Sequence, residues 1–225
     1  MTLTFSVSES WRSAYPGASA GILAMSGVHN PAQHAGLAQR KAELEKMLQE
    51  RFAGLERAAL EALPVMQAYQ AYYQRFKKTF HILLQLESVA LKGKPIPSVA
   101  GLVEAMFMAE LKNGLLTAGH DLDILRPPIE VKAAQGNERY VLLRGQETAL
   151  KAGDMYMEDR QGIISSVLYG PDQRTQITPS TRRVLFAVYA PPGIGKEAVE
   201  QHLNEIQENT RLVAPQAEVE AFEVV

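Results

Sequence analysis

The residues best suited to chemistry lie between Tyr72 and Asp123, where basic and aromatic side chains precede an apolar helix pattern and a Gly-His-Asp sequence. His120 is the leading candidate for a catalytic residue, because a neutral imidazole accepts a proton and a nearby carboxylate orients it. Asp121 supplies such a carboxylate, and Gly119 lets a substrate or another backbone approach closely. The alternative interpretation is a histidine in a turn, with Asp121 acting as a local cap.

A second group of candidates follows Tyr72, where aromatic residues alternate with cations. Arg75, Lys77 and Lys78 suit contacts with phosphates, and interleaved aromatic rings suit stacking with bases. If residues 65–78 form a helix, the aromatic residues share one face, which more often belongs to a hydrophobic core. The cations then lie on another face, against phosphate or simply water. The aromatic residues concerned are Tyr69, Tyr72, Tyr73 and Phe76.

Several other kinds of site are excluded by the residues present. The chain has no cysteine, which excludes a disulfide scaffold, a cysteine zinc site and a thiol nucleophile. Its histidines show no metal-binding spacing, so we expect neither a metal nor another cofactor. The sequence from Gly193 to Lys196 lacks the full spacing of a phosphate-binding loop. Ser165 and Ser166 lie outside any GxSxG sequence, which disfavours a serine hydrolase.

Composition indicates an ordinary globular protein. The 225 residues are 46% hydrophobic and 21% charged, and a chain of this length can bury a substantial core. The sequence shows neither an apolar run of membrane-spanning length nor a secretory signal, so we expect a cytoplasmic protein. A net charge of −2 argues against a protein that coats duplex nucleic acid, which is usually basic. Any contact with nucleic acid should therefore be local, at an end or a loop.

The N-terminal half is predicted to contain two strands followed by helices. Residues 2–7 alternate polar and apolar side chains, and Gly21–Val28 forms a largely buried strand candidate. Asn30 as N-cap and Pro31 in the first turn predict the start of a long helix. We expect Lys41 on the solvated face of that helix. Its apolar face contains Leu37, Leu44, Leu48 and Leu55.

Three further helices are predicted before residue 115. They cover residues 65–78, 82–91 and 99–111. Ser98 is the expected N-cap of the third, which should stop at Asn113-Gly114.

The C-terminal half has a different pattern of apolar residues. Short apolar runs recur about every ten residues with turn residues between them, which is typical of an antiparallel sheet. They lie at 140–143, 155–157, 163–168 and 184–189. A last helix over Lys196–Asn209 and a strand over Val219–Val225 follow. Helices early and strands late predict an α+β fold.

The chain also resembles a known family. The sequences WRSAYPGASAGILAMSGVHNP, YYQRFKKTFHILLQLESV and AMFMAELKNGLLTAGHDLD are similar to free-standing B3/B4-domain proteins, over nearly the whole chain. Over roughly residues 75–190 the chain resembles, more distantly, the B3/B4 editing domain of the bacterial phenylalanyl-tRNA synthetase β subunit. The shared points include a helix ending in Glu110, a His-x-x-Asp signature at His120 and Asp123, and the sequence starting at Thr181.

The resemblance implies a single domain of B3/B4 type over residues 1–225, with a helical N-terminal half packed on a mixed or antiparallel sheet. Its parts are an N-terminal extension (1–70), a B3/B4 core (71–192) and a C-terminal helix and strand (193–225).

The resemblance also implies roles for individual residues. His120 matches the histidine that lines the family's editing pocket, and Ser165, Ser166 and Tyr169 belong to the wall formed by the sheet. Glu104 and Asp121 complete the expected substrate-binding set.

The chain departs from the family at three polar positions. Glu104 and Ala105 replace a Thr-Asn pair, and Ala187 replaces the glutamate that recognises a tyrosyl hydroxyl. The fold and a pocket therefore carry over, whereas editing specific for tyrosine does not.

The function implied is binding of the 3′ end of tRNA or aminoacyl-tRNA, with Arg75, Lys77 and Lys78 contacting the RNA. Deacylation of a mischarged tRNA would accompany it, with His120 orienting water or the aminoacyl group; a full tRNA ligase is not expected. The alternatives are a pocket for an amino-acid-like ligand without RNA binding, and an interaction protein that has kept only the fold. None of these functions requires a membrane.

Overall fold

The strands form two main sheets in the computed structural model, which describes residues 3–225. The first sheet is mixed, because its first two strands run parallel and the remaining neighbours run antiparallel. Its order is β1 (Phe5–Val7), β4 (Ile129–Ala133), β7 (Met155–Asp159), β8 (Gly162–Ser166) and β9 (Gly170–Pro171).

The second main sheet is antiparallel throughout. Its two central strands are almost entirely buried, which fits their continuous apolar sequences. Its order is β11 (Glu218–Val224), β2 (Ser19–Ser26), β10 (Arg183–Ala190) and β3 (Thr117–Asp121). A separate hairpin pairs β5 (Arg139–Val141) with β6 (Glu147–Ala149).

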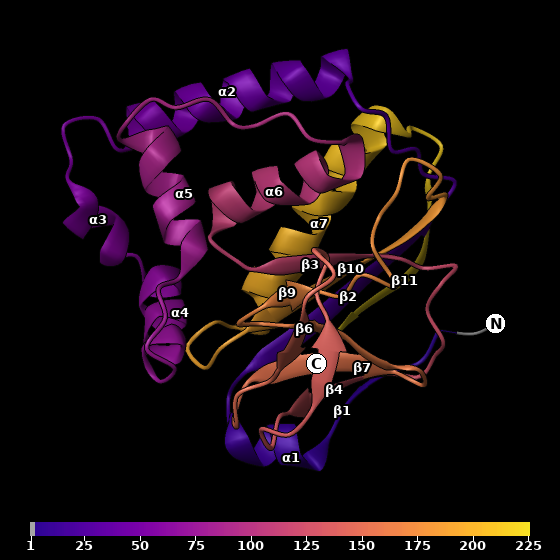
Figure 1. The fold of residues 1–225 in the computed structure, drawn as a ribbon. Helices are drawn as coiled ribbons and strands as arrows, with labels where there is room; N and C mark the ends of the chain where they lie inside the picture. Colours follow the sequence, from indigo (N-terminus) through magenta and orange to yellow (C-terminus); the bar gives the residue numbers. More distant parts are fainter. Residues whose placement is uncertain (1–2) are drawn as a thin grey trace.

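Most of the helices gather on one side of the sheets (Figure 1). Helix α7 (Lys196–Val213) packs against β2 and against α6 (Gly101–Asn113), and α6 in turn contacts α2 (Ala35–Arg51). The remaining helices are α1 (Glu9–Ala14), α3 (Arg57–Glu61), α4 (Pro64–Gln74) and α5 (His81–Ala90). The predicted α+β class is confirmed, with the strands divided between two sheets.

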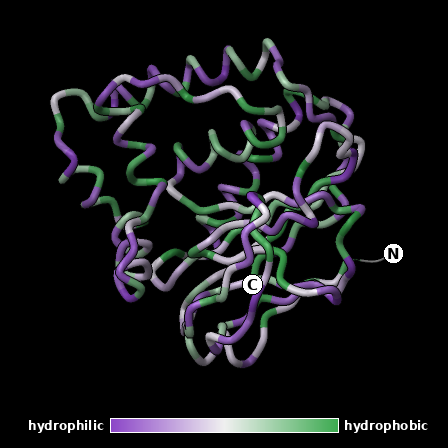
Figure 2. Tube along the Cα trace, in the orientation of Figure 1, coloured by the Kyte–Doolittle hydropathy of each residue, from purple (hydrophilic) through white to green (hydrophobic). Residues whose placement is uncertain are grey.

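One continuous hydrophobic core joins the helices to both sheets, and a smaller cluster lies around Tyr140 under the β5–β6 hairpin. Hydrophobic stretches follow the strands, whereas α2 at the edge of the molecule mixes both kinds of residue (Figure 2). The helix predicted over residues 65–78 ends at Gln74, so Phe76 lies just beyond α4. The expectation that the aromatic residues of this segment face a core is confirmed. Tyr69, Tyr72, Tyr73 and Phe76 are all buried.

The first predicted strand is confirmed over residues 5–7, and Thr2 lies outside the described residues. The predicted helix start at Pro31 is wrong, because α2 begins at Ala35 with His34 as its N-cap. Asn30 instead caps α6, where its Oδ1 accepts a hydrogen bond of 2.9 Å from the backbone N–H of Leu102. Asn30 is therefore a helix cap as predicted, but the residue it caps lies 72 positions further along the chain.

Two expectations about α2 and α6 are also wrong. Lys41 is buried rather than solvated, because it pairs with Glu104 of α6 across the helix contact. Ser98 accepts a hydrogen bond from Lys41 and does not cap α6, whose N-cap is Ala100. The predicted stop is confirmed at Gly114, which adopts a φ of 75°. Leu55 lies beyond the end of α2 and is exposed.

His120 does not lie in a turn. It is the fourth residue of β3, where it pairs with Leu185 of β10. Among the described residues, no helix is long and apolar enough to cross a membrane.

Candidate functional site

The predicted catalytic histidine lies at the centre of a buried network that joins the two main sheets. His120 is completely buried, and both of its ring nitrogens have partners. Its Nε2 lies 3.2 Å from the hydroxyl of Ser165 on β8, and its Nδ1 lies 2.8 Å from the hydroxyl of Thr175. The structure therefore brings together His120 and Ser165, which the resemblance placed on opposite walls of one pocket.

The directions of these hydrogen bonds follow from the partners at each end. The hydroxyl of Thr175 donates to Asp172, so it accepts from Nδ1 of His120. Burial lowers the pKa of His120 to about 3, which keeps the ring neutral and makes Nε2 an acceptor. Ser165 therefore donates to His120 and accepts from the hydroxyl of Tyr189 at 2.6 Å.

Ser165, His120 and Asp172 follow the order of a nucleophile, a base and an acid. The hydroxyl of Ser165 is nevertheless not accessible to a substrate. Ser165 and His120 both have 0% of their surface exposed. In this conformation the histidine holds β8 against β3 and β10, and it fixes the rotamer of Ser165.

An ion pair between Arg174 and Asp159 lies next to the hydrogen-bonded network of His120. Arg174 binds Asp159 with both terminal guanidinium nitrogens, at 2.8 and 3.0 Å. The positive charge of Arg174 also lies near enough to His120 to lower the pKa of the imidazole further.

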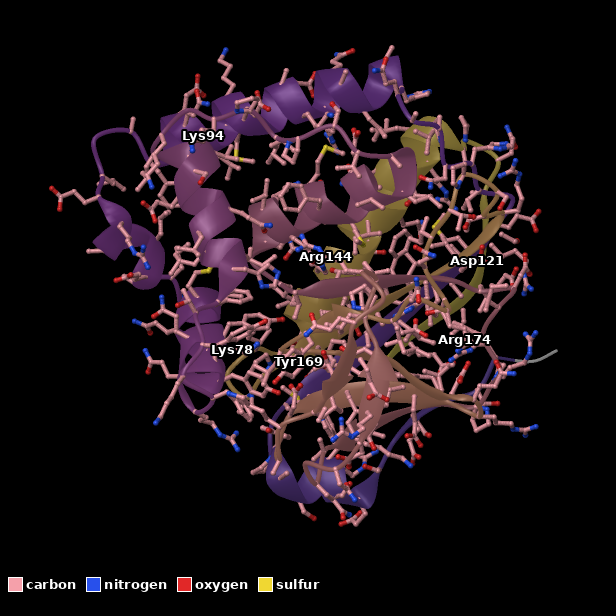
Figure 3. All side chains as sticks on the ribbon, in the orientation of Figure 1. Lys78, Lys94, Asp121, Arg144, Tyr169 and Arg174 are labelled. Carbon is pink, nitrogen blue, oxygen red and sulfur yellow. The ribbon has the colours of Figure 1, made fainter. Side chains whose placement is uncertain are left out.

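Asp121 is adjacent to His120 in sequence but takes no part in its hydrogen bonds. Its Oδ2 accepts from the hydroxyl of Thr181 at 2.6 Å, and its backbone N–H donates to Thr175. Neighbouring residues of a strand point to opposite faces, which explains the separation. Figure 3 shows Asp121 on the same side of the molecule as Arg174 and away from Tyr169.

The next residue along β8 belongs to a second cluster. Ser166 lies 3.2 Å from the hydroxyl of Tyr140 and accepts from the backbone N–H of Tyr169 at 3.2 Å. Strand alternation thus directs Ser165 toward His120 and Ser166 toward Tyr169. The four candidates on β3 and β8 are divided between two faces, rather than lining one pocket.

A buried carboxyl group lies beneath this second cluster. Asp154 has no exposed surface, and one carboxyl oxygen accepts from the hydroxyl of Tyr72 at 2.7 Å. The other oxygen, Oδ2, has no protein hydrogen-bond partner. Burial raises the pKa of Asp154 to about 7, although Tyr72, Ser166 and Lys78 act in the opposite direction. Asp154 carries no sequence signal, since no local pattern distinguishes it from an aspartate in a surface turn.

Of the cations predicted to bind RNA, Lys78 lies beside this cluster, whereas the guanidinium group of Arg75 lies 5.1 Å from the centre of the Tyr15 ring. The ammonium group of Lys78 lies 4.0 Å from the centre of the Tyr169 ring, and the two side chains point toward one another in Figure 3. Lys151, which the sequence analysis did not identify, donates to the backbone oxygen of Phe76 at 2.9 Å. It lies near enough to Lys78 to lower the pKa of that lysine, after the larger effect of burial.

We refer to Arg75, Lys77, Lys78, Lys151 and Tyr169 as the Tyr169 surface. Its lysines and arginine form no ion pair with any residue in the described part of the chain, while many other cations do. Lys77 is exposed and has a φ of 56°, a conformation that most side chains avoid. The surface therefore presents unneutralised positive charge beside a partly exposed aromatic ring.

Glu104 lies apart from both clusters. It forms an ion pair of 2.8 Å with Lys41 and accepts from the backbone N–H of Val99. No group of residues suited to hold a metal ion occurs within residues 3–225.

Residues 67–215 match the model of the B3/4 domain family. This match covers well over half of the chain. The protein belongs to the B3/4 domain family.

Two known proteins extend this assignment. The phenylalanine–tRNA ligase β subunit of Mycoplasma genitalium is 35% identical over 69 residues, which cover 31% of this chain and 9% of that subunit. An N-terminal fragment of the phenylalanyl-tRNA synthetase β subunit from Pyrococcus horikoshii superposes with a TM-score of 0.51 at 15% identity. That superposition covers 100% of this chain and 50% of the fragment, and it supports the fold alone. This B3/4 domain protein therefore spans only a part of each relative.

Proposed function

We propose that this B3/4 domain protein binds the 3′ end of tRNA or aminoacyl-tRNA at the Tyr169 surface. The observation that carries the proposal is the contact between Lys78 and the ring of Tyr169. Lys151 lies near Lys78, and Arg75 and Lys77 precede Lys78 in the sequence. Cations that meet phosphates beside an aromatic ring that stacks on a base are the elements of single-strand recognition. Because a similar protein is a subunit of a tRNA ligase, we expect the bound RNA to be tRNA.

The charge of the whole chain is compatible with a local contact of this kind. A net charge of −2 gives no general attraction for nucleic acid, so binding depends on the few cations of the Tyr169 surface. A footprint this small matches a single-stranded end better than a duplex. We therefore expect affinity to fall with salt, at a slope that corresponds to about three or four phosphates.

The first experiment measures binding of fluorescently labelled tRNA across a series of salt concentrations. Intact tRNA should bind more tightly than the same tRNA without its single-stranded 3′ nucleotides. Equal affinity for both molecules, or affinity independent of salt, would refute binding at the 3′ end.

We extend the proposal to hydrolysis of the aminoacyl ester. The buried network supports it, because His120 holds β8 and the rotamer of Ser165 while Ser166 turns toward the Tyr169 surface. His120 is a positioning residue in this account, since its ring nitrogens are both engaged. Water attacks the ester carbonyl carbon and the bond from that carbon to the ribose oxygen breaks, which releases the amino acid and returns a proton to the ribose oxygen. The adjacent ribose hydroxyl and the positioned backbone contribute through proximity.

Release of amino acid from a panel of misacylated tRNAs tests this extension. His120→Ala should lower the rate sharply, while His120→Gln, which can keep a donor and an acceptor, should retain more activity. The absence of hydrolysis for every substrate, or full activity in His120→Ala, would contradict the extension without affecting the binding proposal.

A further inference from the structure

A cavity of about 410 Å³ lies where the N-terminal ends of α2 and α6 meet. It is lined by residues 33–35, Ala38 and Lys41 of the α2 region, by Ser98, and by Glu104 in the first turn of α6. Both helices begin on the right of the view in Figure 1. The α2 residues lie outside the segment that matches the family. The volume is within the range of small-molecule sites.

The cavity contains a buried ion pair with unused hydrogen-bonding capacity. Lys41 and Glu104 have only 7% and 4% of their side chains exposed, and they lie 2.8 Å apart. Lys41 donates one hydrogen bond to Glu104 and one, at 2.6 Å, to Ser98, which leaves one of its three N–H groups. Ser98 accepts that bond and keeps its own hydroxyl proton as a donor.

The carboxylate of Glu104, the partner of Lys41, also keeps positions that can accept hydrogen bonds. Its carboxylate receives Lys41 and the backbone N–H of Val99, at 2.8 Å each, which leaves about two of its four lone-pair positions. The cavity thus offers a positive donor group and a negative acceptor group next to each other.

The start of α2 contributes two further polar features. No side chain caps the first turn of α2, whose N–H groups carry the partial positive charge of the helix dipole. His34 lines this end of the cavity, and its buried Nδ1 has no protein hydrogen-bond partner.

We propose that this cavity binds a free α-amino acid. The carboxylate of the ligand would receive the remaining N–H of Lys41, the hydroxyl of Ser98 and the first turn of α2, while its ammonium group donates to Glu104. A dianion such as phosphate would be repelled by Glu104, and a simple cation would be repelled by Lys41. Ala35 and Ala38 have small side chains and leave room for the side chain of the ligand.

The test is a calorimetric titration of the full chain with each of the common amino acids, in the absence of RNA. At least one free amino acid should bind, and its N-acetyl and carboxamide derivatives should bind at least tenfold more weakly. No binding by any amino acid, equal binding of the blocked derivatives, or tighter binding of inorganic phosphate would overturn the proposal.

Two matched variants locate the site without disturbing the ion pair. Ala38→Phe fills the cavity and should lower affinity at least tenfold, whereas Ala42→Phe, at an exposed position of α2 outside the cavity, should change it less than twofold. Circular dichroism confirms that both variants are folded. Binding that survives Ala38→Phe would contradict this site. The titration contains no RNA, so its result is separate from that of the tRNA experiments.

Discussion

His120 shows how a residue selected for its chemistry can carry a structural role as well. His120 forms hydrogen bonds with the hydroxyls of Ser165 and Thr175, and this network continues from Thr175 to the carboxyl group of Asp172. This network requires a neutral imidazole, because Ser165 donates to Nε2. The protonation state of His120 is therefore coupled to the stability of the junction between the sheets.

The first prediction concerns the pH dependence of that coupling. The pKa of His120 is about 3 in the folded protein, whereas the unfolded chain has an ordinary histidine pKa of about 6.5. Between these values the unfolded chain binds a proton that the native state does not, so His120 destabilises the fold as pH falls. Relative to His120→Gln, the wild type should lose about 1.4 kcal/mol of unfolding free energy per pH unit below pH 6.

Urea denaturation of both proteins at pH 7.5, 6.5 and 5.5 measures this difference. A stability difference that stays constant over this range would show that His120 is protonated equally in both states.

The second prediction concerns Asp154, whose pKa change has the opposite sign. The folded pKa is about 7 and the unfolded value is near 3.8, so the native state keeps a proton that the unfolded chain loses. The contribution of Asp154 to stability therefore falls as pH rises from about 4 to 7 and is constant above. Asp154→Asn keeps an acceptor for Tyr72 and removes this loss, which amounts to at most about 4 kcal/mol at pH 8.

Thermal or urea unfolding of Asp154→Asn at pH 5 and pH 8 provides the check. The variant should gain stability relative to the wild type at the higher pH. Parallel curves for the two proteins would rule out a buried, protonated Asp154.

At the scale of elements, the contact between α2 and α6 depends on a buried charge pair. Removing one partner of such a pair leaves the other charge unsolvated, which costs more than the pair itself contributes. We predict that Lys41→Met lowers the free energy of unfolding by about 3 kcal/mol, and that the double variant with Glu104→Met recovers most of the loss.

Lys46→Met is the matched control for this prediction. Lys46 pairs with Glu50 on the same helix, and the two side chains are 77% and 68% exposed, so its loss should change stability by less than about 0.5 kcal/mol. Urea denaturation compares the three variants. A cost for Lys41→Met as small as that for Lys46→Met would mean that the buried pair contributes little to the helix contact.

These elements also show what local sequence can and cannot predict. The predicted positions of helix α5 and strand β10 nearly coincide with the observed ones, because an apolar pattern is a property of the local sequence. The burial of Lys41 depends on Glu104, 63 positions further along the chain, and the capping by Asn30 depends on α6. Local periodicity carries no information about such partners, so it predicts an exposed position for a lysine among polar neighbours.

At the scale of the whole molecule, the two sheets decide which candidate residues meet. The sequence identified His120, Ser165, Ser166 and Tyr169 individually, and the pairing of the strands divides them between a buried junction and a surface. Thr175 and Asp172, which complete the junction, come from the loop after β9 and carry no sequence signal. The Tyr169 surface likewise requires Lys151, which the fold brings next to Phe76.

The most direct test of tRNA binding at the Tyr169 surface compares two charge reversals in the salt series. Lys77→Glu with Lys78→Glu alters that surface, and Lys94→Glu reverses an exposed lysine beyond the other end of α5 (Figure 3). The double variant should bind tRNA at least tenfold more weakly at 100 mM salt, with a salt slope lower by about two, while Lys94→Glu stays within twofold of the wild type. Circular dichroism verifies folding. Unchanged binding by the folded double variant, or an equal loss in Lys94→Glu, would contradict the account.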